Sequence, residues 1–145
     1  MRRMGMIIFA LSGIMIFESV YKPTASIEVK ITHITHKTGQ IEVYLFRNPG
    51  NFPVHKDRAY RHQSVSIGSG EVKVMFRDVP YGEYAVSVYQ DVNGNGRFDR
   101  NFIGMPAEPY ALSGEPRFRF GPPLFGDCKI RVEKPLVRLQ LELKE

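Results

Sequence analysis

The chain has 145 residues, of which 43% are hydrophobic, and it carries a formal net charge of +5. That length fits one domain with a real core, and the single cysteine, Cys128, excludes a disulfide within the chain. From Ser26 onward 17 Lys and Arg residues stand against 14 Asp and Glu residues, spread without a dense basic block, which argues against nucleic-acid binding.

The N-terminal segment has the pattern of an export signal. Arg2 and Arg3 precede an uncharged, mostly apolar run of 14 residues from Met4 to Phe17, which is the length of a signal core and short for a membrane span. We predict a signal peptide or N-terminal anchor at residues 1–25 and one domain at residues 26–145. Cleavage would follow Ala25; the alternative is an uncleaved anchor, the only membrane contact that we expect. Either way, the domain is predicted to be secreted or periplasmic.

Apolar and polar residues alternate in seven short runs after this segment. The runs cover residues 27–31, 41–45, 65–67, 72–76, 84–88, 128–132 and 137–143. Strict alternation places one set of side chains on each face of a strand. Separated by Gly and Pro turns and without a helical repeat, the runs predict an all-β Greek-key sandwich of about seven antiparallel strands. Cys128 begins one run and is predicted to be a small buried hydrophobic residue.

Two long connections interrupt the runs, at residues 47–64 and 91–127. Connections of this length in a compact domain are usually functional or fixed by a contact. The second begins with Asp-Val-Asn-Gly-Asn-Gly-Arg-Phe-Asp, in which oxygen-bearing side chains recur at alternate positions and a glycine takes the sixth place. The predicted metal ligands are Asp91, Asn93, Asn95, Arg97 through its backbone carbonyl, and Asp99, with Gly96 at the turn. This spacing is typical of a calcium loop.

The loop departs from an EF-hand at the twelfth place, where Phe102 stands instead of a bidentate glutamate. A strand, and not a helix, precedes it. The missing carboxylate would come from elsewhere, and Glu108 and Asp127 are candidates. The alternative is a metal-free turn, because Asn-Gly pairs such as Asn93-Gly94 are good turn formers on their own.

Aromatic residues outside the alternating core positions are plentiful. They are Tyr44, Phe46, Phe52, Tyr60, Tyr81, Tyr89, Phe98, Phe102, Tyr110, Phe118, Phe120 and Phe125. They either cover the second face of a sheet or form an exposed platform for a sugar or peptide.

No nucleophile motif is present in the sequence, and a carboxylate pair drawn from Asp57, Glu108 and Asp127 would be needed for a hydrolase.

Three segments carry a family resemblance: residues 76–99, residues 103–113 and residues 121–127. In order and spacing they resemble the bacterial secreted family known as domain of unknown function 2141, over Ile27 to Leu143. The resemblance implies an exported β-rich domain that typically carries the Asp-x-Asn-x-Asn-Gly loop. The turn Pro80-Tyr81-Gly82 is also similar to that of transthyretin-like and collagen-adhesin B-type sandwiches, which implies a fold and no function.

From these observations we expect a non-enzymatic, exported β-sandwich with a structural calcium site. Its partner would be an unknown protein or a cell-envelope glycan. The alternative hypothesis is a carbohydrate- or peptide-binding module that uses exposed aromatic residues, and the least favoured is an unrecognised hydrolase.

Overall fold

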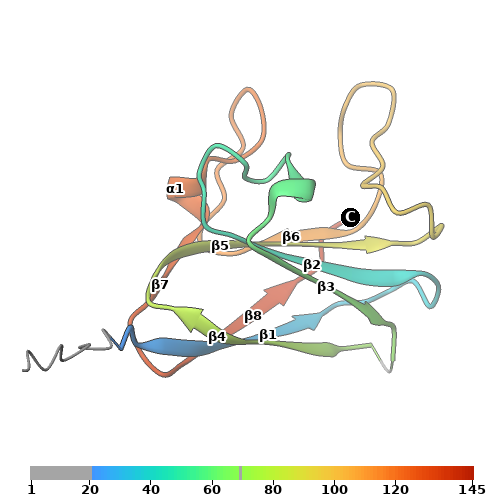
Figure 1. The fold of residues 1–145 in the computed structure, drawn as a ribbon. Coiled ribbons are helices and arrows are strands. Elements are labelled where there is room, and N and C mark those ends of the chain that lie inside the picture. Colours follow the sequence, from blue (N-terminus) through green and yellow to red (C-terminus); the bar gives the residue numbers. More distant parts are fainter. Residues whose placement is uncertain (1–20, 69) are drawn as a thin grey trace, which may run out of the picture.

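The computed structural model describes residues 21–68 and 70–145, which form two facing β-sheets (Figure 1). The three-stranded sheet has the order β4 (Val72–Pro80), β1 (Thr24–Thr32) and β8 (Leu136–Glu142). The other sheet has the order β3 (Arg61–Ser66), β2 (Gln40–Phe46), β5 (Gly82–Asp91) and β6 (Tyr110–Leu112), with β7 (Lys129–Val132) also paired with β5. Two short helices, η1 (Lys56–Arg58) and α1 (Phe125–Cys128), lie in the connections. The predicted all-β fold is therefore confirmed.

Strand pairing differs from the prediction in two places. The described residues hold eight strands, where the sequence predicted about seven, because the three-residue β6 pairs with Ser87, Val88 and Tyr89 of β5. A strand this short shows no alternation in the sequence. In addition, β1 and β8 run parallel, whereas every other pair of strands is antiparallel.

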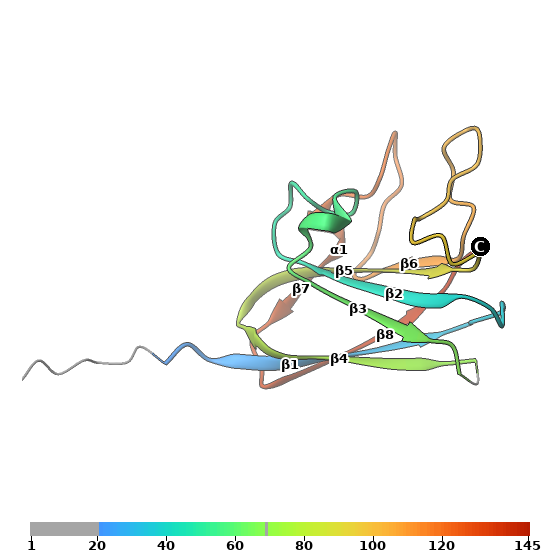
Figure 2. The same cartoon turned by 45° about the vertical axis from the view of Figure 1, so that its right-hand side comes forward.

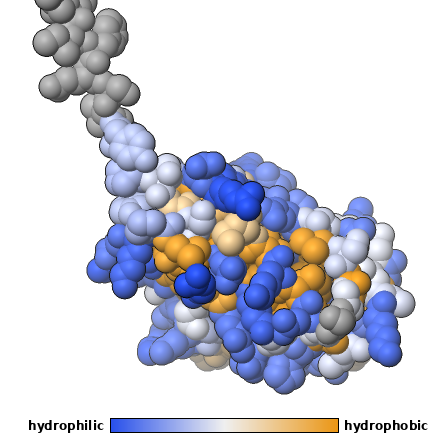
Figure 3. Space-filling view, turned by 90° about the horizontal axis from the view of Figure 1, so that it is seen from below, coloured by the Kyte–Doolittle hydropathy of each residue, from blue (hydrophilic) through white to orange (hydrophobic). Residues whose placement is uncertain are grey.

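The larger hydrophobic cluster fills the space between the sheets. Its fully buried members include Ile27 and Val29 of β1, Val43 of β2 and Val86 of β5. Alternate residues of each strand point inward, which is the arrangement that the sequence pattern predicted. From the side of the three-stranded sheet, apolar residues lie among a mostly hydrophilic surface (Figure 3). Val65, Val72, Val137 and Leu139 pack against this cluster and are only partly buried, so the three-stranded sheet leaves the edge of the core accessible to solvent.

The other face of the five-stranded sheet carries a second hydrophobic cluster. It consists of Tyr44, Phe46, Phe52, Ala85, Tyr89, Phe125 and Cys128. Because of it, β2 is buried on both faces. Cys128 is buried as predicted, although it ends α1 and does not belong to the following strand. The predicted role of aromatic residues as cover for a second sheet face is therefore confirmed for part of the set.

Three connections stand on this face of the five-stranded sheet: residues 47–60, residues 92–109 and residues 113–124 (Figures 1 and 2). The sheet gives them a rigid base, and their positions define the candidate site described below.

The N-terminal boundary also bears on the predicted segments. β1 begins at Thr24, two residues before the predicted start of the domain, and Ala25 is buried. Residues 1–20 of the predicted signal segment lie outside the described residues. In the described ranges, no helix is long and apolar enough to cross a membrane. Every strand and both hydrophobic clusters of the described residues lie within residues 24–143, so the fragment 21–145 contains both sheets and both clusters.

Candidate functional site

The loop of residues 91–99 at the end of β5, which we call the polar loop, is closed by the buried carboxylate of Asp91. One carboxylate oxygen accepts a hydrogen bond from the backbone N–H of Asn95 at 3.1 Å, and the other accepts one from that of Gly96 at 2.8 Å. Asp91 is only 4% exposed. Gly96 has a φ of 74°, in the left-handed region that favours glycine. The sharp turn predicted at the sixth place is therefore present.

The side chains at places three, five and nine converge on one point. The amide nitrogen of Asn93 donates to Asp99 at 2.7 Å, and that of Asn95 donates to the same carboxylate at 2.9 and 3.1 Å. The amide oxygens face backbone N–H groups instead: that of Asn93 accepts from Asn95, and that of Asn95 accepts from Arg97. A cation at this point would require the two amides to turn over and present their oxygens, because cations bind oxygen lone pairs.

Of the two candidates for the missing carboxylate, the structure brings Glu108 to the loop. Its Oε1 accepts from the backbone N–H of Val92 and its Oε2 from that of Asp99, both at 3.0 Å. Glu108 is 5% exposed and therefore joins the two ends of the loop from within. Asp127 lies in α1, where its backbone bonds to Glu115 and Leu124.

Acidic residues alone do not form a metal site here. In residues 21–68 and 70–145, no group of three or more His, Cys, Asp or Glu side chains is placed to hold a metal ion. A cation in the loop would therefore depend on the Asn oxygens and on backbone carbonyls beside the carboxylates. An all-oxygen set of this kind suits hard cations such as calcium, which takes six to eight oxygen ligands.

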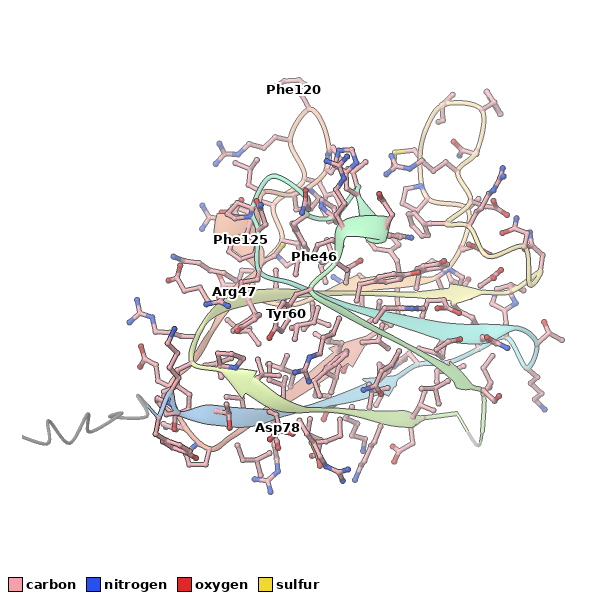
Figure 4. All side chains as sticks on the ribbon, viewed as in Figure 1. Phe46, Arg47, Tyr60, Asp78, Phe120 and Phe125 are labelled. Carbon is pink, nitrogen blue, oxygen red and sulfur yellow. The ribbon has the colours of Figure 1, made fainter. Side chains whose placement is uncertain are left out.

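A cleft of about 1260 Å³ opens beside this loop, between the three connections and the five-stranded sheet. Residues 96–98 of the polar loop belong to its lining, so the loop and the cleft share a wall. The remaining lining comes from β2, β3, β5 and β6, from residues 100–106 of the same connection and from the other two connections. Side chains of these elements crowd the upper half of the molecule, with Phe120 at the tip of one connection and Phe46 and Phe125 near the sheet (Figure 4).

The lining of the cleft includes five aromatic residues in consecutive contact, which we call the aromatic row: Tyr44, Tyr89, Phe98, Tyr110 and Phe118. Tyr44 and Tyr89 are stacked, with centroids 6.1 Å apart and an interplanar angle of 5°. The next three pairs meet edge to face at 5.2, 6.0 and 6.1 Å. These separations lie in the range where aromatic pairs attract. At the other end of the aromatic row, the ring of Tyr44 stacks on the ring of His62, with centroids 4.3 Å apart.

Lys56 places its ammonium group among the rings of this row. Its Nζ lies 3.5 Å from the ring centroid of Tyr89, 4.5 Å from that of Phe98 and 5.5 Å from that of Tyr44. The nitrogen is buried and has no hydrogen-bond partner among the described residues. Burial lowers the pKa of Lys56 to about 8, because the charged form loses its hydration. Sequence reasoning missed this residue, since no local spacing links it to the rings.

Some of the aromatic residues predicted to form an exposed platform are buried, and others are exposed. Tyr44, Phe46, Phe52, Tyr89 and Phe125 are buried. Phe102, Phe118 and Phe120 are exposed on the connections, and Phe102 and Phe120 are fully so. Three carboxylates were considered for a hydrolase: Asp57, Glu108 and Asp127. Of these, only Asp57 lines the cleft, and its side chain is exposed.

Two facing sheets, a polar loop and a loop-built cleft over one sheet define a small all-β protein. A family model described as "Uncharacterized protein conserved in bacteria (DUF2141)" matches residues 29–140. The chain therefore belongs to this bacterial family, as the resemblance in its sequence indicated. Searches of the curated proteins and of the solved structures gave no match.

Proposed function

We propose that the protein is an exported, non-catalytic binding module whose ligand lies in the cleft, and whose loop Asp91–Asp99 holds a structural calcium ion. The observation that carries the binding role is the aromatic row along the cleft, including the exposed ring of Phe118. Aromatic side chains offer a large contact area at a small cost in conformational entropy. An all-β scaffold that presents a ligand on loops is a common arrangement for recognition.

The calcium role is supported by the convergence of Asn93, Asn95 and Asp99. Their side chains already meet, so a bound ion would replace amide–carboxylate hydrogen bonds with direct coordination. Asp91 and Glu108 hold the backbone of the loop in place through N–H groups at both ends. With two carboxylates in the predicted ligand set, the dissociation constant would be on the order of 10⁻⁴ M, as in extracellular modules.

The two roles are connected through residues 96–98, which belong both to the loop and to the cleft lining. Phe98 is part of the aromatic row, and it follows directly after Arg97, whose carbonyl is a predicted ligand. An ion that fixes this backbone would fix the ring of Phe98 within the cleft. The calcium ion would then affect ligand binding by fixing residues 96–98 of the cleft lining, without contacting the ligand.

The predicted export signal agrees with this role, because calcium is plentiful outside the cytoplasm. We also propose that the sandwich is transthyretin-like, since the turn between β4 and β5 is Pro80-Tyr81-Gly82 and Gly82 has a φ of 154°. This relationship concerns the fold only.

The test is a calcium titration followed by amide NMR on the fragment 21–145. We expect the amide signals of Asn95, Gly96 and Phe98 to move with calcium and to stay in place with magnesium. Asp99→Asn should abolish the shifts, and Asp127→Asn, the same change in α1, should leave them intact. Absence of any shift at about 10 mM calcium, above the range of extracellular modules, would reduce the loop to a metal-free turn.

A further inference from the structure

We infer that the ligand of the cleft is an anion: a small molecule that joins one acidic group to a flat aromatic or acyl body. This inference rests on the proposed binding role of the cleft, and it adds the chemical class of the ligand.

The charged residues of the lining are almost all cationic. Lys56, Arg97, Arg100 and Arg119 line the cleft, and Asp57 is the one carboxylate among the lining residues. Asp57 lies 3.7 Å from Arg58, a residue outside the lining. The cleft therefore carries a net positive charge that would attract an anion.

Some basic residues on the strands are paired with acids. Lys30, Lys129 and Arg138 each lie within 3.5 Å of a glutamate. By contrast, none of the four lining cations forms an ion pair with a described residue. The four cations of the cleft therefore remain available to an anion.

Lys56 is the clearest example, because the acids around it are already bonded to other groups. Glu108 accepts from two backbone N–H groups, and Glu42 accepts from Ser64 and contacts His62. A buried ammonium without an acceptor is costly, and contact with aromatic rings offsets only part of the cost. An anion in the cleft would add the missing negative charge.

The remaining lining residues indicate the body of the ligand. The aromatic row and the apolar side chains of Val54 and Met105 offer contact to a flat or acyl group. A neutral sugar would need side-chain amides or acids for its hydroxyl groups. Among the described residues, the lining contains no Asn or Gln, one serine (Ser87) and one acid (Asp57), so a neutral glycan fits this cleft less well than an anionic amphiphile.

The experiment uses two fluorescent probes of similar shape on the fragment 21–145. 1-Anilinonaphthalene-8-sulfonate carries a sulfonate, and N-phenyl-1-naphthylamine lacks it. We expect the sulfonate to bind about tenfold more tightly, which corresponds to one charge-assisted contact. Lys56→Met and Arg119→Gln should each reduce this preference, and Lys56→Arg should retain it. Lys73→Met, on the exposed face of β4, is the matched control and should leave it unchanged.

The outcomes separate this inference from the proposed function. Equal affinity for the two probes, with both weakened by Phe118→Ala, would leave the binding cleft in place and overturn its preference for anions. A preference for the sulfonate that survives Lys56→Met and Arg119→Gln would also overturn it. If neither probe binds, or if Phe118→Ala has no effect on either, the binding role of the cleft fails as well. Arg119 is exposed on a connection, so its variant keeps the test valid if Lys56→Met does not fold. Displacement of the sulfonate by dodecanoate would assign an acyl body, and displacement by indole-3-acetate an aromatic one.

Discussion

Lys56 places its ammonium nitrogen 3.5 Å from the centre of the Tyr89 ring, in the floor of the cleft. The lysine comes from η1 and the tyrosine from β5, so this contact fastens the connection 47–60 to the sheet. Tyr89 is almost fully buried and also contacts Tyr44 and Phe98, its two neighbours in the aromatic row.

This contact predicts an energetic coupling between the two residues. A double-mutant cycle with Lys56→Met and Tyr89→Leu should give a coupling of about 1 kcal/mol, typical of a cation over an aromatic ring. Tyr89→Leu alone should lower the free energy of unfolding by about 2–4 kcal/mol, because it opens a cavity under the cleft. Urea denaturation measures both quantities. Additive effects of the two substitutions would show that the ring does not stabilise the ammonium.

Replacing Glu108 should weaken both ends of the polar loop. Glu108→Gln keeps the size of the side chain but turns an amide N–H₂ toward one of the two backbone donors. We expect a loss of about 1–3 kcal/mol in the free energy of unfolding, the cost of a buried donor without an acceptor. Urea denaturation in chelator should detect it, since these bonds need no ion. Glu115→Gln, at an exposed position, serves as control and should have no effect. Equal stability of Glu108→Gln and the native chain would contradict the bridging role.

The lowered pKa of Lys56 predicts a pH dependence of anion binding. Burial is the main cause; Arg100 lowers the pKa further, whereas Glu108, Glu42 and Asp91 act in the opposite direction. Below a pH of about 8 the ammonium is charged and attracts an anion; above it the charge is lost. Affinity for the sulfonate probe should therefore fall between pH 7 and pH 9. The uncharged probe should bind equally at both values, and Lys56→Arg should remove the dependence. A flat profile for the native chain would contradict the assignment.

The start of β1 predicts how far the domain can be shortened. Thr24 and Ala25 pair with Pro80 and Val79, and the carbonyl of Pro23 accepts from the backbone N–H of Tyr81. A fragment 26–145 loses these contacts and the buried methyl group of Ala25. It should be less stable than the fragment 21–145 by about 1–3 kcal/mol, the contribution of a few hydrogen bonds and one buried methyl group. Equal midpoints in urea would show that the first residues of β1 do not contribute.

Local patterns in the sequence were sufficient to predict the structure where one strand or one loop determines its own conformation. Alternation located β1, β2, β4, β5 and β8, and the glycine spacing located the turn at Gly96. They failed where distant segments decide the outcome. β6 exists only because β5 offers it a partner, and β2 is buried on both faces because connections cover its outer side. Lys56 meets rings from β2, β5 and the polar loop, and no single stretch of sequence contains that arrangement.

Calcium binding by residues 91–99 is tested most simply by the thermal unfolding of the fragment 21–145 in chelator, in excess calcium and in excess magnesium. At about a hundredfold excess over the dissociation constant, a bound ion stabilises the folded state by roughly 2.7 kcal/mol. For a domain of this size that predicts a rise in Tm of about 10 °C with calcium. Magnesium should have little effect, and Asp99→Asn should remove the rise. Identical melting curves in chelator and calcium would contradict the account and leave residues 91–99 as a polar turn held by its own hydrogen bonds.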